Sequence, residues 1–356
     1  MDRLHGALLV QCLPDEVDGV RQLTSGRPGA GVLVTTPDVE SARRAAGPAG
    51  VRDVMVLDAS RYAGARRLSA SVPFRESWLD LQRELDLPVL TDSGYAGPED
   101  HAGVTSVLDR TARLGPHVVA TLALSPWWFD ESGGLGFLLE QVERAGVPVA
   151  VALEHQRDPL GVRRTLCGLI RLIGVGVPVI QLRCDVSGLG LLCHGAWAAA
   201  VGTRSNLRHF YPTTKNTGGF APRQARTATV VKECLSYIDV ARIALAVQAD
   251  PDDSLWLPCE CAVCGYRTLD WLSTLPDAAQ QRRAAFGHAW ETLLDLRDAL
   301  VAATSSPADR QASWRAHCEN AIARFQGVNG GGASWSAPPF LRCWRSLPLA
   351  TPTTSR

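Results

Sequence analysis

Apolar, β-branched stretches of strand length recur along the middle of the chain at a regular spacing of thirty residues. They begin at Leu87, His117, Val147 and Val177. A stretch with helical spacing of its apolar positions follows three of them, over residues 101–115, 133–146 and 159–174. Glycine closes two of these stretches just before the next strand, as a C-terminal cap does. The pattern predicts βαβ units of a parallel sheet.

The same alternation extends in both directions. Predicted strands at 31–37 and 53–60 precede predicted helices at 38–47 and 76–85. Beyond the central block, the pattern predicts a helix over 188–199, a strand near 200–210, a long helix over 225–247 and a short strand at 254–258. About eight βα units predict a (β/α)8 barrel, and such barrels typically have about 250 residues. A doubly wound open sheet is the alternative, but no GxGxxG follows the first strand.

Polar residues stand at the carboxyl ends of the predicted strands, where barrels carry their functional groups. They are Asp58, Asp92, Ser93, Ser125, Trp127, Trp128, Glu154, His155, Arg183, Asp185, Arg208 and His209. Asp92 and Asp185 precede small residues, so each could instead cap a helix. Because polar groups from several strands converge there, we predict the functional site at the carboxyl ends of the strands, which we call the mouth of the sheet.

A tight cysteine cluster, CECAVC, follows the last predicted strand and contains Cys259, Cys261 and Cys264. Three thiolates at this spacing can surround one soft metal ion, and His288 in a helical stretch offers a fourth ligand. Cys3His is a structural zinc arrangement with no open coordination position. The alternatives are fortuitous cysteines and a redox pair. Cys261 and Cys264 form CxxC, but a thioredoxin-like motif would begin a helix after a strand.

These features predict three parts: a barrel over 1–258, a zinc-binding helical subdomain over 259–326, and a flexible tail over 327–356. The tail is rich in Gly, Ser and Pro. The formal net charge is +0, which argues against a large uniform basic surface but not against a local basic groove. No apolar run of membrane-spanning length and no export signal is found, so we expect a cytoplasmic protein with reduced cysteines and no membrane partner.

Two motifs together resemble the tRNA-guanine transglycosylase family. They are LTDSGY, from Leu90 to Tyr95, and CxCAVC followed by a histidine some two dozen residues later. The resemblance covers roughly Leu87 to Phe325. It implies a (β/α)8 barrel with a C-terminal zinc subdomain, and exchange of a guanine-type base in tRNA or DNA for a 7-deazaguanine.

The resemblance also assigns residues. Cys259, Cys261, Cys264 and His288 match the family's zinc ligands one for one. Asp92 matches the aspartate that contacts the base and can act in acid–base roles, and Ser93 and Gly94 would line the same pocket.

The sequence departs from the family pattern at other positions. Tyr95 replaces the family's second glycine, and the nucleophilic aspartate that precedes a PTR-type segment has no counterpart. The segment 254–258 runs almost directly into the zinc motif, and YPTTKN at Tyr211 is only faintly similar to PTR. VIQLRCD, over 179–185, is a weak counterpart of the family's GIQQG pocket strand.

Base exchange requires a carboxylate at the sugar, an acid–base group at the departing base, and a base removed from its stack. Asp92 supplies one carboxylate. For the other we favour Asp185 over Glu154, because Arg183 and His194 are near it in sequence. Glu154, Arg183, Arg208 and His209 are the predicted substrate-binding residues, together with Ser93 and Gly94. Arg204, Arg208 and His209 could hold phosphate, and Trp127 and Trp128 either stack a base or cap the mouth.

Three functions remain open from the sequence. The first is a transglycosylase-like enzyme with structural zinc, whose partners are nucleic acid and a purine or 7-deazapurine base. The second is a non-catalytic member that keeps barrel and zinc and has lost the nucleophile; a homodimer or a heterodimer is compatible with either. The third is an unrelated barrel hydrolase that uses Asp92, Asp185 and His194.

Overall fold

The computed structural model describes residues 2–47, 54–213, 226–302, 306–332 and 335–348. The chain divides into two compact units, Met1–Thr213 and Thr214–Arg356. This division falls earlier than residue 258, where we expected the barrel to end. Among the described helices, none combines the length and the apolarity that crossing a membrane requires.

The first unit contains one sheet of eight parallel strands in the order β3-β2-β1-β8-β7-β6-β5-β4. The strands are β1 (Ala7–Cys12), β2 (Ala30–Thr35), β3 (Val54–Asp58), β4 (Tyr95–Ala96), β5 (Ala120–Leu124), β6 (Val149–Leu153), β7 (Val179–Cys184) and β8 (Ala198–Gly202). Neighbours in the sheet are neighbours in the chain, apart from β1 beside β8. This is the strand order of a barrel opened between β3 and β4.

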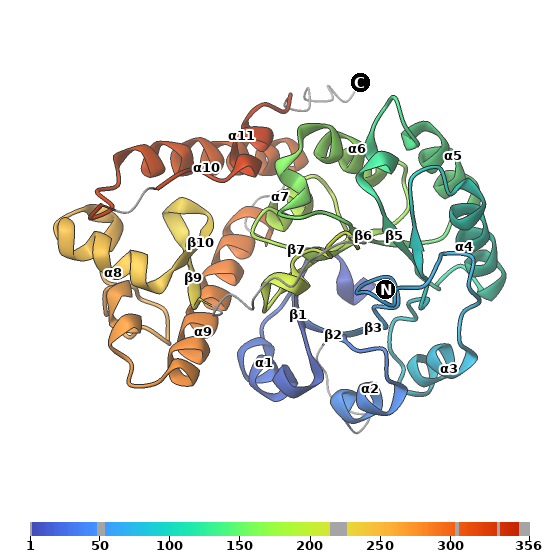
Figure 1. Ribbon diagram of the computed structural model, residues 1–356, viewed down its shortest axis with the longest axis horizontal. Helices are drawn as coiled ribbons and strands as arrows, with labels where there is room; N and C mark the ends of the chain where they lie inside the picture. Colours follow the sequence, from blue (N-terminus) through green and yellow to red (C-terminus); the bar gives the residue numbers. More distant parts are fainter. Residues whose placement is uncertain (1, 48–53, 214–225, 303–305, 333–334, 349–356) are drawn as a thin grey trace. The chain divides into compact units, whose positions relative to one another are not determined.

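Helices connect the strands and lie around the outside of this unit (Figure 1). They are α1 (Val17–Thr24), α2 (Val39–Ala46), α3 (Glu76–Glu84), α4 (His101–Leu114), α5 (Leu135–Ala145), α6 (Arg163–Ile173) and α7 (Gly188–Cys193). Short 3-10 turns stand at η1 (Asp2–Leu4), η2 (Pro14–Glu16), η3 (Pro126–Phe129), η4 (Pro159–Gly161) and η5 (Ser205–Leu207). Local sequence explains several helix ends: Asp38 and Asp100 accept backbone N–H groups as N-caps, and Gly146 ends α5 in the left-handed conformation.

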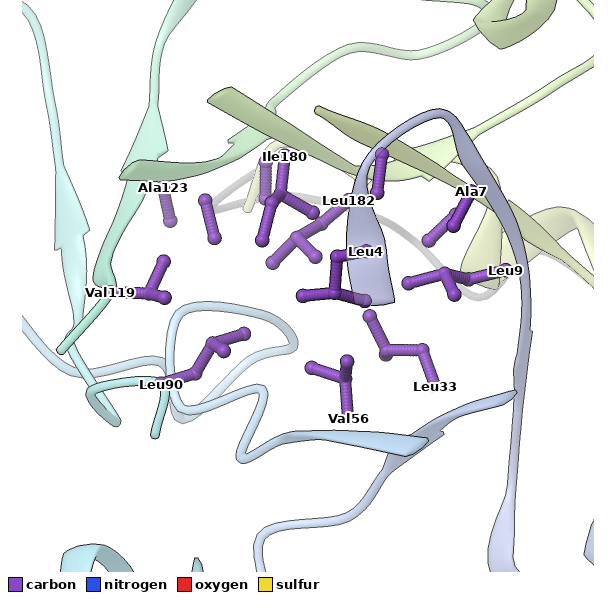
Figure 2. Close-up of a cluster of buried hydrophobic side chains, with 14 of the residues drawn as sticks. Leu4, Ala7, Leu9, Leu33, Val56, Leu90, Val119, Ala123, Ile180 and Leu182 are labelled. Atoms are coloured by element: carbon purple, nitrogen blue, oxygen red, sulfur yellow. The ribbon is translucent and has the colours of Figure 1, made fainter. Parts of the chain in front are cut away.

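The sheet is curled, so that side chains from distant strands meet on its inner face. One buried cluster joins Val56 of β3 at one edge, Leu90 near the other edge, and Ile180 of β7 in between. Figure 2 shows these side chains pointing toward a common interior, with Leu4 of η1 among them. Strands that are apolar along their whole length suit a sheet covered on both faces.

The edge near β4 is completed by a side chain in place of a strand. Gln82 of α3 accepts the Leu90 N–H and donates to the Leu90 carbonyl, both at 2.9 Å. On the other side, Leu90 forms a parallel bridge with Val119. The amide of Gln82 therefore satisfies the backbone groups that a neighbouring strand would otherwise pair.

The predicted and observed strands differ at the two ends of the pattern and after Leu87, where only Leu90 forms a bridge and the strand β4 begins at Tyr95. β1 comes from the apolar N-terminal stretch that we had not assigned to the sheet, whereas predicted strand 254–258 contains the 3-10 turn η7 (Ser254–Trp256). The predicted helix over 188–199 stops at Cys193, because the chain turns into β8 at Ala198.

The predicted helix over 225–247 is also wrong in its first half. The described residues there form an antiparallel hairpin of β9 (Ala228–Val231) and β10 (Ser236–Asp239), followed by α8 (Val240–Ala249). The β-branched run Thr229 to Val231 favours a strand, and Leu235 turns the chain in the left-handed conformation after η6 (Lys232–Cys234).

The other named elements that the structure describes in the second unit are helical. After α8 it contains η8 (Leu269–Thr274), α9 (Ala278–Arg297), a π-helical turn η9 (Asp298–Ala302), α10 (Pro307–Gly327) and α11 (Pro339–Arg345). We expected 327–356 to be a flexible tail, but the structure differs at α11, where Phe340, Leu341 and Trp344 are buried. Three apolar side chains on one short helix stabilise its packing despite the Gly- and Pro-rich flanks.

Candidate metal centre and strand-end site

The four predicted metal ligands come together in the second unit. The ligand atoms of Cys259, Cys261, Cys264 and His288 all lie within 4.8 Å of one another. The His288 Nδ1 atom is 3.5 Å from the Cys259 and Cys261 sulfurs and 3.3 Å from the Cys264 sulfur. These residues form a cluster that could hold a metal ion.

The distances fit a tetrahedral ion of zinc size. Zn–S bonds of about 2.3 Å and a Zn–N bond of about 2.0 Å at tetrahedral angles give S···N edges of roughly 3.5 Å. The three observed sulfur–nitrogen distances are at or just below this value. Cys264 and His288 are buried, and Cys259 and Cys261 are half-buried.

His288 is oriented by a backbone group. Its Nε2 lies 2.9 Å from the carbonyl oxygen of Val230 in β9, and a carbonyl can only accept, so Nε2 carries the hydrogen. Nδ1 then faces the three sulfurs, and it would offer its lone pair when a metal ion replaces its proton. Metal-binding histidines commonly hold their second nitrogen in this way, which fixes both tautomer and ring orientation.

The cysteine loop is a tight reversal of the chain. Cys259 N donates to the Arg267 carbonyl, and Tyr266 N donates to the Cys259 carbonyl, each at 3.0 Å. Gly265 and Tyr266 have positive φ values of 57° and 62°. The chain adopts this left-handed conformation where it reverses direction between Cys259 and Arg267. Two N–H groups also point at sulfur: Cys264 N to Cys261 Sγ at 3.3 Å, and Trp271 Nε1 to Cys264 Sγ at 3.4 Å.

Protonation within the cluster also suits a cation site. Hydrogen bonds from Cys259 and Cys264 lower the pKa of the Cys261 thiol far below its usual value. Burial lowers the pKa of His288, but its contacts with Cys259 and Cys261 outweigh burial and raise it to about 9. Hydrogen bonds with Cys259 and Cys261 raise the pKa of the Cys264 thiol, so Cys261 has more thiolate character than Cys264. A bound zinc ion would require all three cysteines as thiolates, so binding would release protons.

In the first unit, Asp92 is paired more completely than a free catalytic carboxylate. Its Oδ2 accepts from Arg61 Nη1 and Arg75 Nε, both at 2.7 Å, and its Oδ1 accepts the Arg75 N–H at 3.1 Å. The Asp92 side chain is 0% exposed. Two guanidinium groups thus neutralise it and anchor the β3–α3 connection to the LTDSG segment.

The neighbours of Asp92 are buried and closely packed. Ser93 Oγ lies 2.9 Å from the Thr91 hydroxyl. A Cβ atom at Gly94 would come within 2.2 Å of the Ser69 carbonyl oxygen, so only glycine fits against this backbone. The LTDSG segment is therefore constrained by packing as well as by its ion pairs.

Glu154, at the end of β6, is held between two partners. It forms an ion pair with Arg67, and the Tyr95 hydroxyl donates to its Oε2 at 2.5 Å. The Arg67 guanidinium also lies 3.8 Å from the centre of the Tyr95 ring. Tyr95 stands where the similar motif of the transglycosylase family has its second glycine. In this structure its hydroxyl contacts the Glu154 carboxylate.

Arg183 belongs to a buried polar network. Its guanidinium donates to the Tyr62 hydroxyl at 3.0 Å, the Ser60 hydroxyl at 2.6 Å and the Asn206 carbonyl at 2.7 Å. Tyr62 in turn donates to Asp58 Oδ2 at 2.8 Å. Arg183 has a φ of 51° at an irregularity of β7, and this turns the following residues out of the strand.

Asp185, just beyond β7, is the least enclosed carboxylate among the predicted catalytic residues. Its side chain is 27% exposed, its Oδ1 accepts the Val186 N–H at 2.7 Å, and its Oδ2 lies 4.0 Å from Arg208. His209 is close enough for the charge of Asp185 to act on it. Burial nonetheless lowers the pKa of His209 to about 4, and its Nε2 has no hydrogen-bond partner among the described residues.

A pocket of about 450 Å³ opens beside these groups. It is lined by Pro126, Glu154, His155, Gln156, Arg157 and Pro212. Its volume is within the usual range for small-molecule sites. Asp92 and Asp185 are not among its lining residues.

The remaining predicted groups are distributed differently. Trp128 is 0% exposed, donates to the Gly97 carbonyl at 2.8 Å and packs edge-on against Trp127, so its ring is not open to a stacked base in this structure. Arg204 pairs with Glu16 and Asp15. His194 stands at the C-terminal end of α7, while Asp185 precedes the start of that helix, so the helix separates the two.

Several residues of the mouth were not predicted from the sequence. Arg61, Arg67 and Arg75 lie in or next to the long β3–α3 connection, which has no strand-end pattern to mark it. Asp158 accepts the Leu160 N–H at 2.9 Å, and its Oδ2 is buried. Only its place before Pro159, typical of a helix N-cap, could have marked it.

Comparison with known proteins adds no family assignment. No protein-family model and no curated protein matches this chain.

Proposed function

We propose that this chain is a transglycosylase-like enzyme that exchanges a guanine-type base in tRNA or DNA for a 7-deazaguanine. The observation that carries the proposal is Asp185, a partly exposed carboxylate beside Arg208 at the mouth of the sheet. Such a group can approach the sugar carbon of a nucleotide. Arg208 and His209 would contact its phosphate, and the pocket lined by Glu154 and Arg157 would take the base.

Within this proposal, Asp92 has an electrostatic and positioning role. Both of its oxygens are engaged by Arg61 and Arg75 and its side chain is 0% exposed, so it holds Ser93 and Gly94 in place. Glu154, fixed by Arg67 and Tyr95, offers an acceptor for the N–H groups of a guanine edge.

We also propose that the metal is a structural zinc ion held by Cys259, Cys261, Cys264 and His288. Four protein ligands leave no position for substrate. When bound, the ion would cross-link the cysteine loop to α9. It would take no part in the reaction.

The proposed enzyme has a (β/α)8 barrel whose closure runs through the β3–α3 connection. Ser69 of that connection forms a parallel bridge with Tyr95 of β4. An experimental structure without this pairing, or with a wide gap beside β3, would contradict the closed form.

The test is incorporation of labelled guanine or 7-deazaguanine into tRNA and into DNA by the purified full chain. Asp185→Asn should abolish incorporation. The control Glu131→Gln changes an exposed carboxylate that pairs with Arg171, and it should leave incorporation unchanged. Incorporation that survives in Asp185→Asn would refute the role of Asp185.

A non-catalytic partner subunit is the second candidate, and the complete pairing of Asp92 favours it. A carboxylate held by two arginines is suited to stabilising the fold rather than to transferring a proton. Absence of incorporation into any nucleic acid, together with tight binding to a catalytic transglycosylase, would support this alternative.

A further inference from the structure

We propose that Asp158 and Asp185 form an acid–base pair at the mouth of the sheet, in which Asp158 holds the proton and Asp185 the negative charge. The inference rests on the proposed base exchange and adds a catalytic residue to it. The two aspartates follow neighbouring parallel strands, β6 and β7, so both stand at the same end of the sheet.

The two carboxyl groups have contrasting surroundings. Asp158 Oδ1 accepts the Leu160 N–H at 2.9 Å, whereas its Oδ2 is buried and accepts no hydrogen bond from any described residue. Asp185 is 27% exposed, its Oδ1 is capped by the Val186 N–H, and Arg208 lies 4.0 Å from its Oδ2. A buried oxygen without a donor disfavours the charged form, and an exposed oxygen near a guanidinium favours it.

The electrostatics agree with this geometry. Burial, followed by the negative charge of Asp185, raises the pKa of Asp158 to about 7, although the Leu160 amide and Ser187 act in the opposite direction. Other titratable or charged groups around the pair are Cys184, His155, Arg183, Arg208 and His209. Carboxyl groups whose surroundings separate their pKa values are the usual basis for dividing acid and base roles.

The pair accounts for both halves of a base exchange. As the bond between the sugar C1′ and the base nitrogen breaks, its electron pair goes to that nitrogen, which takes the proton of Asp158. Asp185 supplies an oxygen electron pair to C1′. The incoming base then gives its N–H proton to the Asp158 carboxylate, its nitrogen bonds to C1′, and the C1′–oxygen electrons return to Asp185. Both residues end in their starting forms.

Asp158 is not itself among the residues that line the pocket, but it belongs to the loop that supplies four of them. It directly follows Arg157, which lines the 450 Å³ pocket together with Glu154 and His155. The pocket wall and the proposed proton donor thus belong to one loop after β6.

The first measurement needs no activity. In full-length protein with ¹³Cγ-labelled aspartate, one carboxyl resonance should titrate at about pH 7. Asp158→Asn should remove it, and Asp185→Asn should move its midpoint toward about 4, the ordinary value for aspartate. Asparagine can still cap η4, so the variant should fold. The control Asp277→Asn changes the N-cap of α9 and should leave the resonance in place.

The second measurement is the pH profile of base incorporation. Asp158→Asn should lower incorporation about 100-fold or more and remove the fall in rate above about pH 7. An Asp158 midpoint near 4, a midpoint unaffected by Asp185→Asn, or wild-type incorporation by Asp158→Asn would overturn the pair. A midpoint near 7 in a protein that incorporates no base would leave the proton-holding pair intact and refute the proposed function instead.

Discussion

The Nε2 atom of His288 in α9 lies 2.9 Å from the carbonyl oxygen of Val230 in β9. This contact ties the cysteine cluster to a hairpin nearly sixty residues earlier in the chain. It orients the imidazole so that Nδ1 faces three sulfurs, before any ion is considered. The cluster is therefore a preorganised site, and its properties can be tested directly.

Removal of zinc should destabilise the second unit. Without a cation, no bond holds Cys259, Cys261 and Cys264 of the loop to His288 of α9, although their ligand atoms lie within 4.8 Å of one another. We expect one zinc per chain by metal analysis, and a lower melting temperature after chelation. Cys264→Ser should lose the metal, whereas Cys167→Ser in α6 should retain it. A protein that folds fully without stoichiometric zinc would refute the assignment of a structural zinc site.

Trp271 should tune the metal site without being a ligand. Its Nε1–H lies 3.4 Å from Cys264 Sγ, and its ring lies 3.6 Å from the Arg267 guanidinium. Trp271→Phe keeps an aromatic ring for Arg267 but removes the donor to sulfur. Loss of such an outer contact typically weakens metal binding about 10-fold or more. Competition with a chromogenic chelator measures the change, and an unchanged zinc affinity would show that the N–H contributes nothing.

Asp92 should be a major contributor to the stability of the first unit. Asp92→Asn would leave Arg61 and Arg75 without their counter-charge in a largely buried setting. We expect a loss of about 3 kcal/mol in the free energy of unfolding, measured by urea denaturation. The matched control is Glu84→Gln, which breaks the exposed pair with Arg43 and should cost less than about 1 kcal/mol. Equal effects in the two variants would contradict a structural role for Asp92.

His209 should make the folded protein sensitive to mild acid. Burial lowers its pKa to about 4 in the folded state, below the ordinary value of 6.5. As the pH falls from 6.5 toward 4, the unfolded chain binds the proton first, so stability present above 6.5 is progressively lost.

The variant His209→Gln isolates this effect. It should lose less stability than the wild type between pH 6.5 and pH 4, as measured by urea unfolding at a series of pH values. Parallel pH profiles for wild type and variant would show that His209 is protonated equally in both states.

The sequence by itself determined the repeating part of the fold. β2, β3 and the strands from β5 to β7 follow from runs of β-branched and apolar residues, because a parallel strand covered on both faces must be apolar along its length. β8 was predicted only in part, since Ala198 and Ala199 were assigned to the preceding helix. The sequence pattern nonetheless included one segment that is not a strand and missed one segment that is. It took 254–258 for a strand and overlooked β1, because neither short apolar run has a spacing that distinguishes a strand from a turn.

The metal cluster was also readable from the sequence, since a close set of cysteines has few other uses and a helix offers one histidine to it. The mouth was not. Arg61, Arg75 and Asp158 acquire their partners only when the β3–α3 connection and the loop after β6 fold against neighbouring strand ends. Ion pairing and burial depend on distances between segments far apart in the chain, and local sequence patterns carry no information about those distances. Tertiary structure therefore decided that Asp92 is neutralised by arginines, and that Asp158 is buried with one oxygen unpaired.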